Sequence, residues 1–231
     1  MNMEDINKWK KMVEEIIPQK LKSYPFTGSS PRKFSDEIKD IREKALQRAI
    51  IQSSHSKLSD NIYTWLDIEL PVGQEKIEDK NSNRFRIDLI GKANNNKFAI
   101  VELKYGNSKD SPEEGTYQLL NYFYNIILNK EILDEKEVYH HNRKKEWLWS
   151  DLNFDNVELI LAGDKVYWNK YSNEKRLVFN LGELFPKVCY YSININNINY
   201  FSEQSKGQKY TPKLTENENI WEEIDMNRFN P

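Results

Sequence analysis

The sequence predicts a single α/β domain in which a mixed β-sheet is flanked by helices. Apolar or alternating segments of strand length lie at 61–72, 84–90, 98–104 and 157–163. Segments with the apolar spacing of helices lie at 35–53 and 112–129. A chain of 231 residues, 38% of them hydrophobic, is long enough to bury one full core.

Composition narrows the class of protein. The single cysteine, Cys189, permits no internal disulfide, and its apolar surroundings favour a place in the core over a role as nucleophile. The charged segment 1–17 lacks the apolar centre of a signal peptide, and no run is long and apolar enough to span a membrane, so we expect a cytoplasmic protein. The net charge of −2 argues against a nucleic-acid footprint over the whole surface, but residues 84–110 carry six basic and three acidic residues.

Two helices are expected before the first strand. The first covers residues 3–17 and is closed by Pro18. Ser35 has the character of an N-cap for the second helix, 35–53. Glu43 lies at the edge of the apolar face of this helix. It is either a solvated helix residue or an acid that joins a functional site.

The strand 61–72 is expected to alternate regularly between two faces. We expect Ile62, Thr64, Leu66, Ile68 and Leu70 on one face and Tyr63, Trp65, Asp67 and Glu69 on the other. Because this strand should neighbour the strand 84–90, Glu69 is the alternative to Glu43 as an acid that joins the site.

Residues 84–106 read as two strands joined by the turn GKANNNK, whose Gly and Asn residues tolerate positive φ. In the first strand we expect Phe85, Ile87 and Leu89 on one face and Arg86 and Asp88 on the other. In the second, Glu102 and Lys104 are two residues apart and share a face. Counting back around the turn places Asp88 near the same end of the hairpin.

Two carboxylates and one ammonium group are therefore expected to converge. Neighbouring carboxylates repel each other, and a divalent cation relieves that repulsion. A small set of hard oxygen ligands suits Mg²⁺ or Mn²⁺, which keep several waters. The simpler alternative is that Glu102 and Lys104 form a solvated pair on an open sheet face.

The helix 112–129 should be buried between layers, because it is apolar nearly all round. Ser111, Pro112 and Glu114 predict a capped start. Gln118 and Tyr122 share one face, where they are either partly solvated or directed into a site. A crossover through this helix should make the apolar strand 157–163 parallel to its neighbour. Further strands are expected at 175–181 and 188–195, and the segment 199–231 is expected to be peripheral.

The run RID…VELK resembles the motif of the PD-(D/E)XK nuclease superfamily. Asp88, Glu102 and Lys104 match its three charged positions, and Ile87 stands in place of the proline. The resemblance covers residues 34–163. It implies an αβββαβ, restriction-endonuclease-like core, with a domain layout of 1–33, 34–198 and 199–231.

The resemblance also implies roles for individual residues. Mg²⁺, or Mn²⁺, would be held by Asp88, Glu102 and the carbonyl group of Leu103, with Lys104 orienting the attacking water. Glu43 with Leu46 and Gln47 resembles an E-x-x-L-Q pattern of the superfamily, and Gln118 with Tyr122 resembles a Q-x-x-x-Y element of one branch. The residues implied to contact phosphates are Arg84, Arg86, Lys109 and Tyr122.

The function implied is a Mg²⁺-dependent nuclease that hydrolyses phosphodiester bonds of DNA. A compact chain without a helicase or ATPase motif suggests an endonuclease of restriction or anti-phage defence. The alternatives are an RNA-directed nuclease and a catalytically inactive nucleic-acid-binding or scaffold module. A homodimer would bring two sites to two strands, which the sequence alone does not decide.

Overall fold

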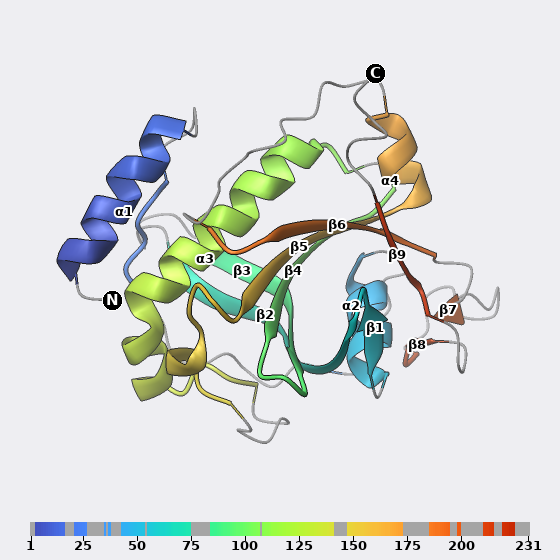
Figure 1. Ribbon diagram of the computed structural model, residues 1–231. Coiled ribbons are helices and arrows are strands. Elements are labelled where there is room, and N and C mark those ends of the chain that lie inside the picture. Colours follow the sequence, from blue (N-terminus) through green and yellow to red (C-terminus); the bar gives the residue numbers. More distant parts are fainter. Residues whose placement is uncertain are drawn as a thin grey trace.

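The computed structural model describes residues 3–16, 21–26, 35, 37, 43–53, 55–74, 84–106, 108–140, 147–172, 185–194, 198–199, 210–214 and 219–224. It is a mixed α/β fold built on a seven-stranded sheet (Figure 1). In spatial order, the strands of the sheet are β1 (Ser56–Leu58), β2 (Asn61–Gln74), β3 (Arg84–Ala93), β4 (Phe98–Lys104), β5 (Val157–Asp164), β6 (Val188–Ile193) and β9 (Trp221–Glu223). A separate pair is formed by β7 (Ile198–Asn199) and β8 (Lys213–Leu214).

Both parallel and antiparallel pairs occur in the main sheet. The strands β1 to β4 form consecutive antiparallel pairs, and β5 then lies parallel to β4, as the crossover predicts. β6 is parallel to β5, and β9 closes the sheet as an antiparallel neighbour of β6. β9 comes from the region expected to be peripheral, yet Ile220 and Trp221 are buried in the core. The strand expected at 175–181 lies outside the described residues.

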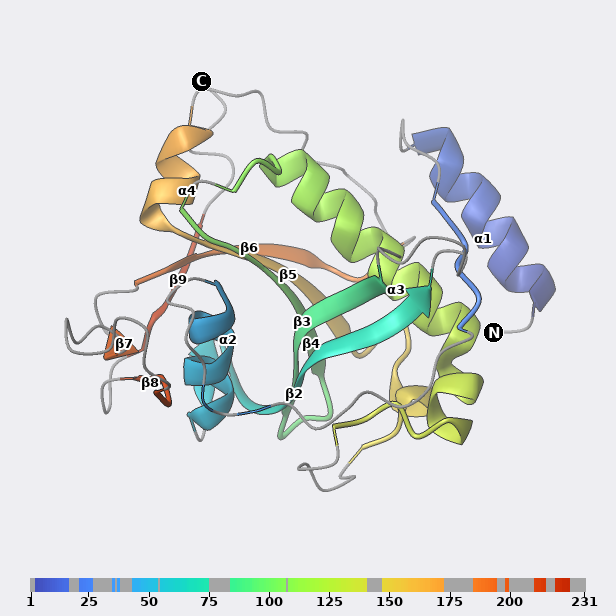
Figure 2. The ribbon, with the colours of Figure 1, turned by 180° about the vertical axis from the view of Figure 1, so that it is seen from behind.

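Helices cover both faces of the sheet (Figures 1 and 2). The helical elements are α1 (Met3–Ile16), α2 (Glu43–Gln52), α3 (Pro112–Glu135), the short 3-10 helix η1 (Trp149–Asp151) and α4 (Lys165–Lys170). The long helix α3 crosses one face, α2 lies on the other, and α1 packs outside α3. None of the helices in the described ranges is long and apolar enough to cross a membrane.

The start of one predicted helix and the end of the other are revised. Ser35 Oγ accepts a hydrogen bond of 3.2 Å from the Glu37 backbone N–H, as an N-cap would, but neither Ser35 nor Glu37 is helical. The described part of α2 begins at Glu43, and residues 36 and 38–42 lie outside the described residues. Helix α3 begins with the predicted capping box at Ser111 but continues to Glu135. The buried Leu133 extends its apolar face beyond residue 129.

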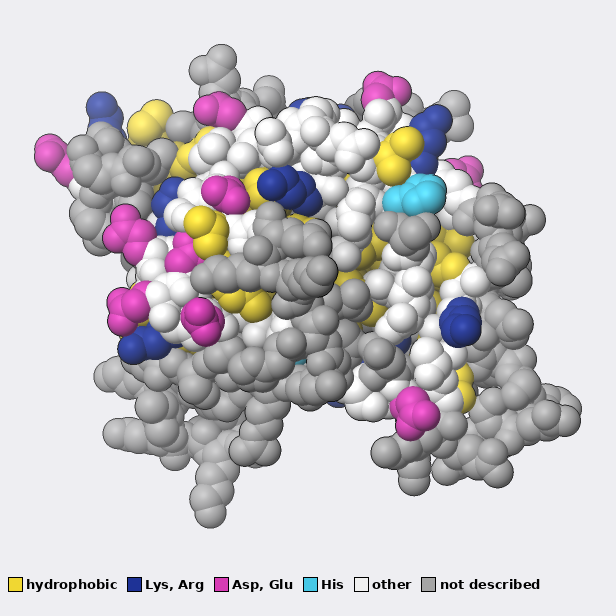
Figure 3. Space-filling model, turned by 90° about the horizontal axis from the view of Figure 1, so that it is seen from below, with side chains coloured by type: hydrophobic (Ala, Val, Ile, Leu, Met, Phe, Trp, Pro, Cys, Tyr) yellow, Lys and Arg dark blue, Asp and Glu magenta, His cyan; other side chains and the backbone are white. Residues whose placement is uncertain are grey.

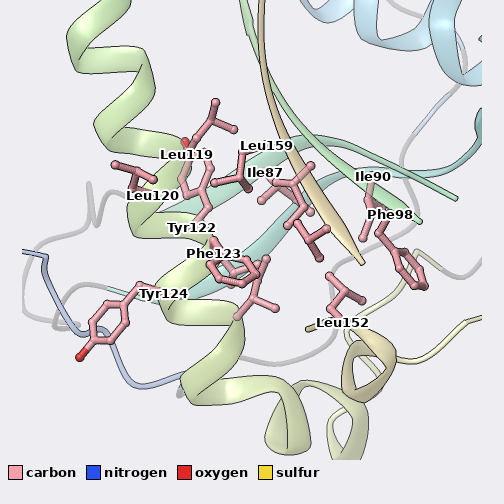
Figure 4. Packing of buried hydrophobic residues seen from close by; sticks show 14 of the residues in the cluster. Ile87, Ile90, Phe98, Leu119, Leu120, Tyr122, Phe123, Tyr124, Leu152 and Leu159 are labelled. Carbon is pink, nitrogen blue, oxygen red and sulfur yellow. The ribbon is translucent and has the colours of Figure 1, made fainter. Parts of the chain in front are cut away.

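The core consists of two apolar clusters, one on each face of the sheet. On the α3 side, Leu119, Tyr122 and Phe123 project from the helix toward Ile87 and Leu159 of the sheet (Figure 4). On the α2 side, the helix packs its small and aliphatic residues on the strands. The α2 residues of this second cluster are Ala45, Leu46, Ala49, Ile50 and Ile51.

The alternation expected for the strand 61–72 fails at Ile68. Trp65 belongs to the cluster under α2 and Leu66 to the cluster under α3, as alternation requires. The pairing of β2 with β3 shifts register between Trp65 and Asp67, and such a bulge moves the side chains that follow it to the other face. Ile68 therefore lies with Trp65 in the cluster under α2, whereas Leu66 and Leu70 lie in the cluster under α3.

The expected alternation of the next strand also fails, at Asp88. Ile87 belongs to the cluster under α3, whereas Leu89 belongs to the cluster under α2. Glu69 lies across from this point, between the pairs Ile68–Leu89 and Leu70–Ile87, and has a φ of +50°. The change of face is therefore a local irregularity of β2 and β3, at Glu69 and Asp88.

Three asparagines of α3 hold the extended segment 21–26 by mimicking a neighbouring strand. The Oδ1 atoms of Asn121, Asn125 and Asn129 accept hydrogen bonds from the backbone N–H groups of residues 22, 24 and 26. The Nδ2 atoms of Asn125 and Asn129 donate to the carbonyls of residues 22 and 24. The spacing matches, because four residues of helix rise about 6 Å and two residues of extended chain about 6.6 Å.

Asn125→Ala should lower the free energy of unfolding by about 2–4 kcal/mol, because it leaves buried backbone groups of the segment 21–26 without partners. Urea denaturation measures the loss. Asn121→Ala is the matched control, since its contact with Lys22 is exposed and should matter less. An equal loss in the two variants would contradict the asparagine ladder as a stabilising feature.

Candidate active site

The site lies where β3 and β4 part. Their antiparallel pairing ends at Leu89 and Val101, so Asp88 and Glu102 would form the next pair but are not bonded through the backbone. β4 stays paired with β5 as far as Lys104 and Gly163. The gap between β3 and β4 admits side chains from the helices on both faces of the sheet.

Asp88 fills the gap with its carboxylate. Its Oδ2 accepts the backbone N–H of Leu103 at 2.7 Å, which replaces a bond that the strand ladder would have made. Its Oδ1 accepts Nε2 of Gln47, from α2, at 2.8 Å. The motif acid is thus fixed by β4 on one side and by α2 on the other.

Lys104 is held by three acceptors. Its Nζ lies 2.8 Å from Glu102 Oε1, 2.7 Å from Asp110 Oδ2 and 2.7 Å from Gln118 Oε1. The lysine side chain is only 5% exposed, and its stem passes the first turn of α3, where a Cβ on Gly115 would lie 3.4 Å from Lys104 Cε. All three N–H bonds of the ammonium group are used.

Both helical layers contribute further polar groups. Glu43, at the start of α2, is partly buried and acts electrostatically on Asp88. From α3, Gln118 binds Lys104 and also donates to Asp110 Oδ2 at 3.2 Å. Tyr122 is buried, and its hydroxyl interacts with the Glu102 carboxylate, so this hydroxyl does not lie in water.

The three carboxyl groups near the gap all have raised pKa values, because each is buried and two of them are repelled by neighbouring acids. Burial, and then the neighbouring Glu102, raises the pKa of Glu43 from 4.5 to about 7. Burial, followed by Glu102 and Glu43, raises the pKa of Asp88 well above its ordinary value. Burial also raises the pKa of Glu102, although Lys104 opposes the rise. One lysine does not neutralise this set of buried acids.

Lys104 and Asp110, unlike the three acids, are stabilised in their charged forms. Burial disfavours the Lys104 ammonium, but Glu102 and Asp110 outweigh burial and raise the pKa of Lys104 above its ordinary value. The hydrogen bond from Lys104 lowers the pKa of Asp110. Lys104 is therefore a cation and Asp110 an anion near neutral pH.

Two buried oxygens at the gap lack a regular hydrogen-bond partner among the described residues. They are Oε2 of Glu102 and Oε1 of Gln47. A bound cation or proton satisfies such acceptors, and hard oxygen donors suit Mg²⁺ or Mn²⁺. The described ranges contain no group of three His, Cys, Asp or Glu side chains placed to hold an ion. Mg²⁺ needs only one or two carboxylates besides water, so the pair Asp88 and Glu102 fits it.

Of the two acids that precede Asp88 in the sequence and were considered for the site, Glu43 acts on Asp88 and Glu69 is engaged elsewhere. Glu69 forms an ion pair with Arg48 at 3.5 Å, which engages its carboxylate. Glu43 and Gln47 are one helical turn apart and approach the site together from α2. Neither the solvated helix residue nor the solvated Glu102–Lys104 pair describes this arrangement, since Glu102 is only 8% exposed.

The basic residues expected to contact phosphates do not gather at one point as the motif residues do. Lys109 is exposed and next to Asp110, whereas Arg86 is partly buried on β3, two residues before Asp88. The side chain of Arg84 lies outside the described part of the chain. Cys189 is buried on β6 and burial raises its pKa to about 11, which agrees with a core position.

Sequence reasoning gave no role to two residues that the structure brings to the motif. Gln47 holds Asp88, and its signal was the E-x-x-L-Q pattern, in which it was named without a role. Asp110 holds Lys104 and comes just before the predicted capping box. In the sequence, it could not be distinguished from an ordinary solvated acid.

Comparisons of the chain with protein-family models, with curated proteins and with solved structures found no match.

The crowded carboxyls make stability depend on pH. Unfolded Glu43 loses its proton near pH 4.5, whereas folded Glu43 keeps it to about pH 7. The folded state thus binds more protons in this interval, and its free energy of unfolding should fall as the pH rises, by about 1–3 kcal/mol. Urea denaturation between pH 4.5 and 7.5, without divalent cations, measures this slope.

Glu43→Gln should flatten the slope because it removes one titrating group and lessens the repulsion on Asp88. Glu131→Gln, at an exposed position of α3, is the matched control and should leave the slope unchanged. A slope as steep in Glu43→Gln as in the unaltered protein would contradict the assigned crowding.

Proposed function

We propose that this chain is a Mg²⁺- or Mn²⁺-dependent nuclease of the PD-(D/E)XK type that hydrolyses phosphodiester bonds of DNA in the cytoplasm. The observation that carries the proposal is the convergence of Asp88, Glu102 and Lys104 where two strands part. A buried Glu102 oxygen without a regular partner supports a cation-binding role. The resemblance in sequence and the contacts in space involve the same three residues.

The arrangement of elements supports the same proposal. With the short strand β1 and the 3-10 helix η1 left aside, the order α2, β2, β3, β4, α3, β5 agrees with the αβββαβ pattern expected of a restriction-endonuclease-like core. The antiparallel strands β2, β3 and β4, followed by the parallel β5, also agree with that expectation. The fold class alone does not imply an activity, so the site carries the proposal.

In the proposed site, Asp88 and Glu102 hold the cation, with the carbonyl of Leu103 as the third protein ligand. A divalent cation at such a site supplies a Lewis acid for a phosphoryl oxygen and makes water more acidic. Gln47 and the Leu103 N–H fix the orientation of the Asp88 carboxylate. Glu43 adds negative charge that favours a cation over an empty gap.

Lys104 acts as a fixed positive charge rather than as a base. The raised pKa of Lys104 keeps it protonated near neutral pH, so it is suited to stabilise negative charge on a phosphoryl oxygen. Gln118 and Glu102 hold its Nζ in place. A preorganised cation in a buried site stabilises developing charge without a reorganisation cost.

The surface leaves the class of nucleic acid open. On the face in Figure 3, charged side chains of both signs are interspersed over the described residues and form no broad basic patch. Binding through a few local contacts is therefore expected, with Lys109 and Arg86 near the site. The cleavage assay distinguishes a DNA nuclease from an RNA-directed nuclease and from a protein that binds nucleic acid without cleaving it.

Purified protein with Mg²⁺ or Mn²⁺ should cleave DNA, and EDTA should abolish cleavage. Lys104→Met should lower the rate about 100- to 1000-fold, the loss typical of removing one stabilising charge or donor. Supercoiled, linear duplex and single-stranded DNA, together with RNA, are followed on gels to identify the substrate. Glu158→Gln is a control acid on the neighbouring strand, bound to Tyr63 and Lys97, and should retain activity.

Binding of DNA without cleavage under any cation would favour the inactive binding module. Cleavage of RNA alone would favour the RNA-directed nuclease. Equal cleavage by Lys104→Met and the unaltered protein, with both folded, would rule out the proposed site.

Cation binding should be measurable without any nucleic acid. At about 100 times its dissociation constant, Mg²⁺ or Mn²⁺ should raise the free energy of unfolding by about 2.7 kcal/mol. Glu102→Gln should lose this response, because it removes one of the two carboxylate ligands, while Glu158→Gln should keep it. Thermal denaturation with and without the cation measures both. An unchanged response in Glu102→Gln would place the cation elsewhere.

A further inference from the structure

Asp110 lies outside the motif and is the more exposed of the two carboxylates that bind Lys104. Its Oδ2 accepts one hydrogen bond from Lys104 Nζ at 2.7 Å and one from Gln118 Nε2 at 3.2 Å. Two donors, one of them charged, thus converge on one anionic oxygen. This is the donor arrangement that binds an oxygen of a phosphate group.

Lys104 has no N–H left for a substrate while all three acceptors stay in place. One acceptor has to leave before a phosphoryl oxygen can bind. Glu102 is 8% exposed and belongs to the same strand, and Gln118 projects from a long packed helix. The Asp110 side chain is 42% exposed and can rotate into water.

The backbone around Asp110 is fixed, so its side chain rather than its loop is free to move. The Tyr171 hydroxyl donates to the carbonyls of Ser108, at 3.1 Å, and Lys109, at 2.9 Å. Lys170 Nζ also binds the Ser108 carbonyl, at 2.8 Å. On the other side, Ser111 begins the capped helix α3. The backbone on both sides of Asp110 therefore keeps this residue beside Lys104.

We propose that the Asp110 carboxylate is an internal stand-in for a substrate phosphate, occupying the oxygen site formed by Lys104 and Gln118 until a phosphodiester displaces it. This inference rests on the proposed nuclease function. Asp110 keeps Lys104 Nζ in place in the free protein. By its negative charge, it also excludes anions too weakly bound to displace it, so it acts on substrate selection rather than on bond cleavage.

The first experiment measures whether Asp110 holds Lys104. Free lysines are trace-labelled with acetic anhydride, and the peptide containing Lys104 is quantified by mass spectrometry relative to that of the exposed Lys57. Asp110→Asn should label Lys104 faster, because loss of the carboxylate removes the partner that covers Nζ on the exposed side of the site. Asp110→Glu should restore slow labelling, and Glu113→Gln, in the adjacent helical turn, should leave it unchanged.

The second experiment adds inorganic phosphate as the probe. Phosphate should protect Lys104 from labelling at a concentration about fivefold lower in Asp110→Asn than in the unaltered protein, because the competing carboxylate is gone. Unchanged Lys104 labelling in Asp110→Asn would overturn the proposal. Equal protection by phosphate in the two proteins would overturn it as well.

A third measurement separates this inference from the nuclease function. Fluorescent DNA and RNA oligonucleotides are titrated with Ca²⁺ present, and Asp110→Asn should bind about fivefold more tightly than the unaltered protein or Glu113→Gln. If phosphate protects as expected but no oligonucleotide binds, the anion site stands and the nuclease function fails. If oligonucleotides bind equally to all three proteins, the role of Asp110 as stand-in is excluded.

Discussion

The parting of β3 and β4 after Leu89 and Val101 is the constraint on which the rest of the site depends. Had the ladder continued, the Leu103 N–H would have been engaged by β3 and Asp88 would have had no opening to occupy. Instead, the carboxylate of Asp88 takes the place of the missing backbone acceptor. β4 keeps its rigid parallel pairing with β5, so Glu102 and Lys104 are held on a fixed strand while β3 diverges. The irregular Glu69, with its φ of +50°, lies on the neighbouring strand next to this divergence.

This geometry concentrates negative charge in a buried place. Glu43, Asp88 and Glu102 each have a raised pKa because burial favours their protonated forms, and repulsion from the neighbouring carboxyl groups adds to this effect on Glu43 and Asp88. A structure shaped only for stability would not bury three such acids beside a single lysine. Local destabilisation of this kind is typical of sites that bind a cation or do chemistry. The pH dependence and the cation response are therefore two consequences of the same crowding.

Sequence patterns predicted the elements well but predicted local irregularities poorly. The period-two pattern and the turn located the hairpin, and the capping box located the start of α3, because each depends on a few neighbouring residues. The face of Ile68 was wrong because the bulge after Trp65 is decided by pairing with β3, which leaves no local signal. The convergence of Asp88 and Glu102 followed from counting around one turn. The contacts of Gln47 and Asp110 depend on how α2 and the start of α3 dock, which a single sequence does not specify.

Helix α3 links the stability of the fold to the chemistry of the site. Its outer face carries the asparagine ladder that holds the segment 21–26, while its inner face carries Gln118 and Tyr122. Asp110 lies just before its capped start. Gln118 reaches Lys104 only if α3 is seated on the sheet, so the asparagines that bind α3 to the segment 21–26 bear on this contact as well. Substitutions in the ladder should therefore act on the site through the position of the helix, without touching any of its charged groups.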